Sequence, residues 1–142
     1  MSTPLPRLLL IADEPRSVAP ERLEAAGYAV TTRKPGGIDL AELARSQVVL
    51  LDVPPAAVRG TQATCRRWRI ELGETYVPVL WLGTDLTPTE VEECLDSGVD
   101  VVLLSPFSTP HLTAQIRALL RLHPLHQRLL SRAGEATPPN QR

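Results

Sequence analysis

Two apolar runs of the sequence end in carboxylates, which makes those acids the first candidates for chemistry. Residues 48–53 read VVLLDV, an aliphatic and β-branched run with Asp52 near its end. Such a run is typical of a central parallel strand that helices cover on both faces. Because sites in open parallel sheets form at the carboxyl ends of strands, we expect Asp52 in a crevice at that edge, not in the core. The alternative is a loop aspartate that satisfies local backbone donors.

The second run, residues 7–12 (RLLLIA), is followed by Asp13, Glu14 and Pro15. It predicts a first strand with acids at its carboxyl end. No glycine-rich phosphate loop follows this strand, and no Ser-His-Asp or Cys-His arrangement is suggested by position. The sequence therefore gives little support to a small enzyme or a nucleotide-binding protein.

Composition and charge limit the classes of protein that remain. The 142 residues suit one domain, and 15 basic against 16 acidic residues give no overall attraction to nucleic acid or to a membrane surface. The longest apolar runs are of strand length and the N-terminus has no secretory pattern, so we expect a soluble cytoplasmic protein. Cys65 and Cys94 are interpreted as reduced structural thiols. His111, His123 and His126 are interpreted as solvent-facing helix residues and not as metal ligands.

Strand-like and helix-like segments alternate along the chain. Strands are predicted at residues 7–12, 28–32, 48–52, 77–82 and 100–104, and helices at residues 17–27, 38–45, 56–72, 88–97 and 110–123. This alternation predicts an α/β fold with a single doubly wound, five-stranded parallel sheet and right-handed crossovers. The strand at 28–32 alternates in polarity and should lie nearer an edge.

The helix at 56–72 has the weakest periodicity. Trp68 and Ile70 are expected to anchor it to the sheet and to leave Arg66, Arg67 and Arg69 in solvent, where such a cluster is either a solvated face or a contact for an acidic partner.

Capping signals mark the later helices. Thr87 and Glu90 have the capping-box spacing, and Ser108 or Thr109 is expected to cap the helix that begins at Pro110. One apolar face of that last helix is formed by Leu112, Ile116, Leu119 and Leu120. Pro124 is expected to end the helix, and residues 125–132 to form one or two further helical turns. This divides the chain into a domain at residues 1–123 and an extension at residues 124–142, disordered from about residue 133.

Four blocks resemble the receiver domain of two-component response regulators, a flavodoxin-like fold. They are residues 8–15, the strand that ends at Asp52, residues 78–82 (PVLWL) and residues 95–107 (LDSGVDVVLLSPF). The resemblance covers residues 8–122. It implies that Asp52 matches the phosphoacceptor and Asp13 one acid of the pair that binds magnesium.

Other positions depart from the family's pattern. Ala12 stands where the second acid is usual, Ser105 where a lysine steadies the phosphoryl group, Gly83 where a hydroxyl switch stands, and Val102 where an aromatic reports phosphorylation. Thr84 would replace the lost hydroxyl only if the strand end shifted by one residue. Asp13 and Asp52, with Glu14 as a third candidate, would hold magnesium more weakly than the usual set, and no cofactor is required.

The departures predict a pseudo-receiver: a non-enzymatic signalling interaction module that conventional aspartyl phosphorylation does not switch. The alternative is a working receiver phosphorylated on Asp52 by a histidine kinase. The expected partner is a protein, either a histidine kinase or an effector, and not nucleic acid or membrane. Because no DNA-binding domain follows residue 122, output is expected to come from another polypeptide. The resemblance implies partner or homodimer contacts through the fourth helix, fifth strand and last helix, which carry Glu90, Glu92, Glu93, His111, Gln115 and Arg117.

Overall fold

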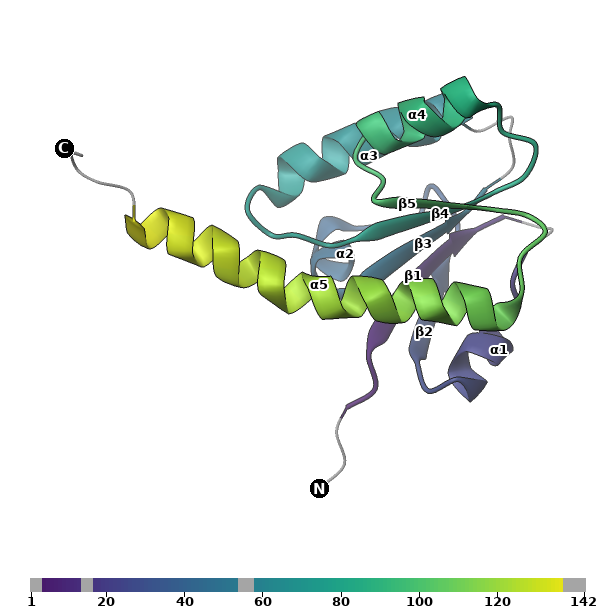
Figure 1. Ribbon diagram of the computed structural model, residues 1–142, viewed down its shortest axis with the longest axis horizontal. Coiled ribbons are helices and arrows are strands. Elements are labelled where there is room, and N and C mark those ends of the chain that lie inside the picture. The colour runs from purple at the N-terminus through teal and green to yellow at the C-terminus, as the bar shows by residue number, and fades with distance from the viewer. Residues whose placement is uncertain (1–3, 14–16, 54–57, 137–142) are drawn as a thin grey trace.

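The computed structural model describes residues 4–13, 17–53 and 58–136, and it contains one five-stranded sheet (Figure 1). All strands are parallel and their spatial order is β2-β1-β3-β4-β5. The strands are β1 (Arg7–Ala12), β2 (Ala29–Arg33), β3 (Val48–Asp52), β4 (Val79–Gly83) and β5 (Val101–Leu104). The predicted doubly wound parallel sheet is therefore confirmed, with β2 at one edge.

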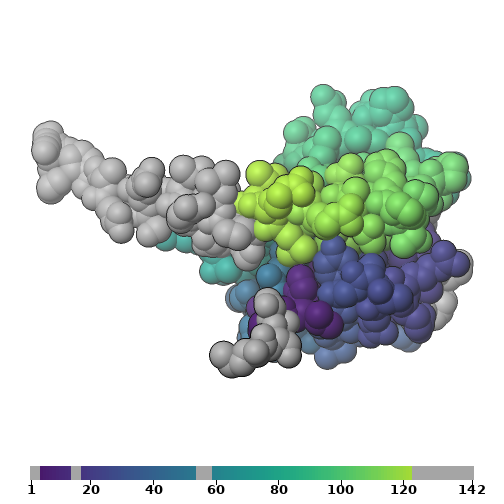
Figure 2. Space-filling model, turned by 60° about the horizontal axis from the view of Figure 1, so that its bottom comes forward, coloured from purple at the N-terminus to yellow at the C-terminus, as the bar shows by residue number. Residues whose placement is uncertain are grey.

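Helices cover both faces of the sheet. They are α1 (Pro20–Ala25), α2 (Leu40–Arg45), α3 (Val58–Leu72), α4 (Pro88–Asp96) and α5 (Thr109–Ala136). In Figure 1, α3 and α4 lie on one side of the sheet, and α1 and α5 on the other. Figure 2 shows the described part of α5 as a green to yellow-green band between the teal α4 segment and the blue α1 segment.

Two apolar cores form because successive strand side chains point to opposite faces. Leu8, Leu10 and Leu50 pack toward α1 and α5, where they meet buried residues such as Leu112 and Ile116. The other core, on the α2, α3 and α4 side, contains Leu9, Ile11, Val49, Leu51, Trp81, Trp68, Cys65 and Cys94. Both cysteines are buried free thiols, as predicted.

Local signals set the helix ends as expected. Thr87 and Glu90 form a complete capping box at α4. The Ser108 hydroxyl accepts from the His111 N–H at 3.1 Å, which makes Ser108 the cap of α5. Gly27 has φ of 102°, a left-handed conformation that only glycine adopts without strain, and it follows α1.

The expected contacts of α3 were partly wrong. Trp68 is buried against the sheet, but Ile70 is 79% exposed. Arg66 and Arg67 are exposed as predicted, whereas Arg69 turns inward and hydrogen bonds to the main chain of two other segments. The reason is geometric: Ile70 falls on the outward side of a helix whose inward side is set by Cys65 and Trp68.

The predicted end of the last helix at Pro124 is also wrong. Helix α5 continues through this proline to Ala136, and Figure 1 shows its final turns extending past the sheet. A proline removes only one N–H donor from a helix, here the one that would reach the Leu120 carbonyl, and the helix continues on both sides of it. Residues 133–136 are thus helical, and the rest of the predicted disordered tail lies outside the described residues. Within the described part of the chain, no helix is long and apolar enough to cross a membrane.

Candidate functional site

The sheet brings the predicted site residues to one edge. Ala12 is the register partner of Asp52 on β1, and Leu82 is its partner on β4. At the next position along, Gly83 pairs with Leu104, and the Ser105 N–H donates to the Gly83 carbonyl at 2.8 Å. The carboxyl ends of β1, β3, β4 and β5 therefore form the rim where the sequence places its candidate chemistry.

Asp52 lies at this rim but not in an open crevice. Its side chain is only 4% exposed, and its Oδ2 accepts a hydrogen bond from the Ser17 N–H at 2.6 Å. This donor lies 35 residues earlier in the chain, so it is not a local loop donor. The carboxylate also does not face open solvent, as a residue in a crevice would. Long-range packing of the segment before α1 against the end of β3 accounts for the difference.

The strand neighbours of Asp52 are apolar. Ala12 and Leu82 are 3% and 1% exposed and belong to the core that faces α1 and α5. Asp52 shares that face because it stands two residues after Leu50 in the same strand. Ala12, the position where the resemblance implies a second acid, supplies no side-chain oxygen ligand.

Among the described residues, few could hold a cation at this edge. Asp13 is exposed beside Ala12, and Glu14 lies outside the described residues. Among the described residues, no group of three or more His, Cys, Asp or Glu side chains comes together as a metal site. Magnesium usually binds through one or two carboxylates plus waters and phosphate, so Asp13 and Asp52 satisfy only the minimum requirement.

A side chain at residue 83, where the resemblance implies a hydroxyl switch, would need the Leu86 side chain to move. A Cβ built at Gly83 would lie 2.8 Å from Leu86 Cδ1 and 3.3 Å from Leu104 Cδ2. The half-buried Leu86 side chain therefore occupies the space beside this glycine. Thr84, the proposed substitute, is exposed.

The other two positions carry small neutral side chains. Val102 is half-buried and pairs with the buried Trp81, so an aliphatic side chain lies in the core where an aromatic would report a change of state. Ser105 is exposed and precedes a cis peptide bond to Pro106. Neither side chain carries a positive charge.

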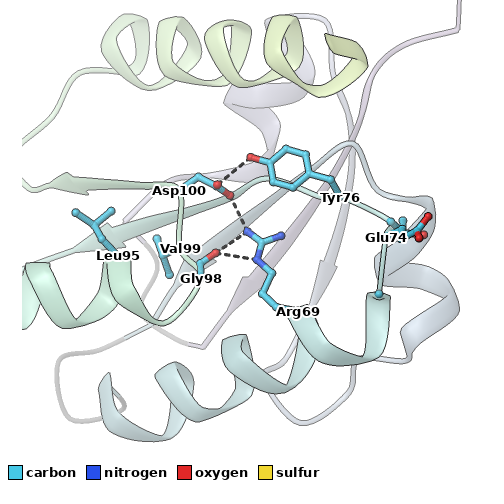
Figure 3. Close-up of a pocket in the computed structure, with 9 residues that line it drawn as sticks. Arg69, Glu74, Tyr76, Leu95, Gly98, Val99 and Asp100 are labelled. Atoms are coloured by element: carbon cyan, nitrogen blue, oxygen red, sulfur yellow. Dashed lines mark hydrogen bonds and ion pairs between the residues drawn. The ribbon is translucent and has the colours of Figure 1, made fainter. Parts of the chain in front are cut away.

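A polar cluster at the opposite end of the strands was missed by sequence reasoning (Figure 3). Arg69 donates to the carbonyls of Gly98 and Val77 and forms an ion pair with Asp100 at 2.7 Å. Asp100 also accepts from the Tyr76 hydroxyl and from the Val79 N–H, each at 2.8 Å.

This cluster lines a cavity of about 400 Å³. The Tyr76 ring lies 5.3 Å from the Arg69 guanidinium carbon. Burial, together with the hydrogen bond to Asp100, raises the pKa of Tyr76. No sequence motif links residues 69, 76 and 100, because the packing of α3 and of the segments before β4 and β5 brings them together.

Comparison with known proteins supports the resemblance to response-regulator receiver domains. No family model matches the chain. The transcriptional regulatory protein CseB of Streptomyces avermitilis is 34% identical over 122 residues, which cover 84% of this chain and 46% of that protein. The DNA-binding dual master transcriptional regulator RpaA of Synechocystis sp. is 33% identical over 121 residues, covering 82% and 50%. The chain thus spans about half the length of the curated relatives it matches.

Solved structures agree on the fold. A response regulator from Thermotoga maritima superposes with a TM-score of 0.66 at 20% identity and covers 82% of this chain and 98% of that one. The β2-β1-β3-β4-β5 parallel sheet with helices on both faces defines a flavodoxin-like fold. Because the chain also shares 33–34% identity with response regulators over more than 80% of its length, it belongs to the response-regulator receiver domains.

Proposed function

We propose that this chain is a pseudo-receiver, a signalling interaction module that works without conventional magnesium-dependent phosphorylation of Asp52. The observation that carries the proposal is the state of Asp52: it is 4% exposed, bonded through Oδ2 to the Ser17 N–H, and flanked on the neighbouring strands by Ala12 and Leu82. A phosphoryl donor would have to displace the Ser17 contact and would then meet apolar neighbours.

The missing positive charge adds a kinetic argument. Phosphoryl transfer depends mainly on positioned charge, and removing one stabilising contact typically costs about 3 kcal/mol in the transition state, or roughly a hundredfold in rate. Ser105 is exposed and neutral at the position of the usual lysine. Its hydroxyl cannot replace an ammonium group.

The switch positions point the same way. Leu86 lies where a threonine or serine side chain at residue 83 would have to sit, and Val102 is aliphatic. A phosphate on Asp52 would therefore find no hydroxyl on residue 83 to draw inward. We infer a domain that signals by being bound, with no enzymatic activity, no required cofactor, weak magnesium affinity and a cytoplasmic location.

The proposed partner is a protein, either a histidine kinase or an effector. The surface that supports this is formed by α4, the edge strand β5 and the first turns of α5, with α4 and α5 on opposite faces of the sheet (Figure 1). Glu92, Glu93, His111 and Arg117 are exposed there, and Leu104 at the end of β5 is 42% exposed. Glu90 is partly committed to the capping box.

A working phosphoacceptor is the second candidate, favoured by the retention of Asp52 at the strand end next to the exposed Asp13. To separate the two, the protein is incubated with acetyl phosphate, with and without magnesium, and its intact mass is measured. Beryllofluoride is added in parallel while the fluorescence of the buried Trp81 is recorded. Asp52→Asn serves as the control.

The pseudo-receiver predicts no added phosphoryl mass and no magnesium-dependent fluorescence change at millimolar magnesium. A phosphoryl adduct present in the wild type and absent in Asp52→Asn would reject it. Ser105→Lys tests the missing charge directly: if its loss is the main defect, this variant gains magnesium-dependent modification, whereas Ser105→Gln, a neutral long side chain, does not.

A further inference from the structure

The outward faces of α3 and α4 carry opposite charges. On α3, Arg59, Ala63, Arg66 and Ile70 follow at spacings of four, three and four residues, so they form one exposed stripe, with Arg67 beside it. On α4 the exposed side chains include Glu92, Glu93, Leu95 and Asp96. The chain as a whole has a net charge of only −1, so this separation is local.

The arginines of this stripe have little to neutralise them. Arg67 lies 4.0 Å from Glu71 on its own helix, with both side chains largely exposed. Among the described residues, Arg59 and Arg66 have no ion-pair partner. Exposed charges of this kind are available for an external partner of opposite sign.

Each face also exposes one large apolar side chain. Ile70 is 79% exposed and Leu95 is 44% exposed. Burying such side chains is the main favourable term in association, while charges around them fix orientation. A basic face with an exposed isoleucine is therefore complementary to an acidic face with an exposed leucine.

The two faces also match in level along the helix axes. Helices α3 and α4 contact each other, and both connect parallel strands, so they run in the same direction. Gln62 of α3 donates to Cys94 Sγ of α4, and Arg69 donates to the carbonyl of Gly98, which follows α4, so Arg66 lies at about the level of Asp96. Glu92 and Glu93 lie about one turn earlier on α4, near the level of Ala63.

We propose that α3 and α4 together form a self-association surface, on which a second copy of this chain docks with its α4 against this α3. A twofold axis that runs parallel to the two helices places α3 of each copy on α4 of the other without changing their levels. Arg66 then faces the second copy's Asp96, with its Glu92 and Glu93 about one turn away, and each contact occurs twice. This surface differs from the α4–β5–α5 surface expected from the family resemblance, and it leaves β5 and α5 accessible.

The test is sedimentation equilibrium of the full chain from about 1 µM to about 500 µM. We expect dimers at about 0.05 M salt that weaken at about 0.5 M, because screening shortens the range of the charge pairs. R66E/R67E should weaken dimerisation about tenfold or more, and so should E92R/E93R, since each reversal makes repeated like-charge contacts. Combining all four substitutions should restore dimerisation.

R117E/R121E, a charge reversal of the same size on exposed arginines of α5, is the matched control and should leave the dimer unchanged. Thermal unfolding of each variant verifies folding. A monomer throughout the concentration range, a dimer insensitive to R66E/R67E, or a dimer lost in R117E/R121E would overturn the proposal. The same holds if the fourfold variant fails to recover, because an acidic protein other than this chain would then be the better match for α3.

Discussion

Gly83 shows how a single residue restricts the chemistry of this receiver. Its position at the end of β4 is where the family places a hydroxyl, yet a Cβ there would lie within 2.8 Å of Leu86 Cδ1. Restoring the hydroxyl therefore requires the Leu86 side chain to move away from residue 83.

Gly83→Thr is predicted to lower the free energy of unfolding by about 1–3 kcal/mol, because the added side chain overpacks the Leu86 contact. Urea unfolding measures the change. In the Leu86→Ala background the same substitution should cost clearly less, since the competing methyl groups are gone. Gly60→Ala is the control: Gly60 lies in α3 and its added Cβ meets no atom within 4 Å, so helix propensity should make that variant as stable as the wild type or more stable. Equal costs in both backgrounds would contradict the packing explanation.

Among the elements, the junction of α3, β4 and β5 is held by charge as well as by apolar contact. Asp100 precedes β5 and accepts hydrogen bonds from Arg69 of α3, from Tyr76 and from the first residue of β4, Val79. Arg69 in turn binds the carbonyl of Gly98, which follows α4. These bonds hold the loops that carry Tyr76 and Gly98, together with the end of α3, at the start of β4 and β5.

Asp100→Ala is predicted to destabilise the protein by about 2–3 kcal/mol, because three donors lose one acceptor and the half-buried guanidinium loses its counter-charge. Chemical unfolding measures the loss. Arg67→Ala removes an exposed 4.0 Å ion pair from the same helix and should cost less than about 0.5 kcal/mol. If the two variants lost the same stability, the cluster would be no more than a surface ion pair.

The stability of the whole molecule should decline at alkaline pH. Burial raises the pKa of the Cys65 thiol from 9.0 to about 12, and burial with the Asp100 hydrogen bond raises the pKa of Tyr76. Both groups therefore keep their protons in the folded state at a pH where the unfolded chain has lost them. Their contribution is complete below about pH 9 and is lost as the pH rises through the folded-state values.

We expect the unfolding free energy to fall steadily from about pH 9 to about pH 11. Urea titrations at several pH values measure the slope. Cys65→Ala and Tyr76→Phe should each reduce that slope, whatever they do to stability at neutral pH, and Tyr28→Phe serves as a comparison because it also removes a phenol. A slope unchanged in both test variants would show that other groups control the alkaline transition.

The sequence by itself determined the order of strands and helices, the capping box of α4 and the placement of Asp52 at a strand end. These features depend on local periodicity, chain stiffness and turn chemistry, which neighbouring residues specify. The resemblance to receivers and the departures at residues 12, 83, 102 and 105 were likewise readable from the chain alone.

Tertiary structure decided the rest, because the decisive partners are far apart in the sequence. Packing buries Asp52 and brings its carboxylate within hydrogen-bond distance of the Ser17 N–H, and it places the Leu86 side chain beside Gly83. Arg69, which was predicted to lie in solvent, is instead the centre of a cluster with Asp100. It also placed the basic face of α3 beside the acidic face of α4. Local pattern specifies which face of a helix is polar, whereas the fold alone determines which polar groups meet.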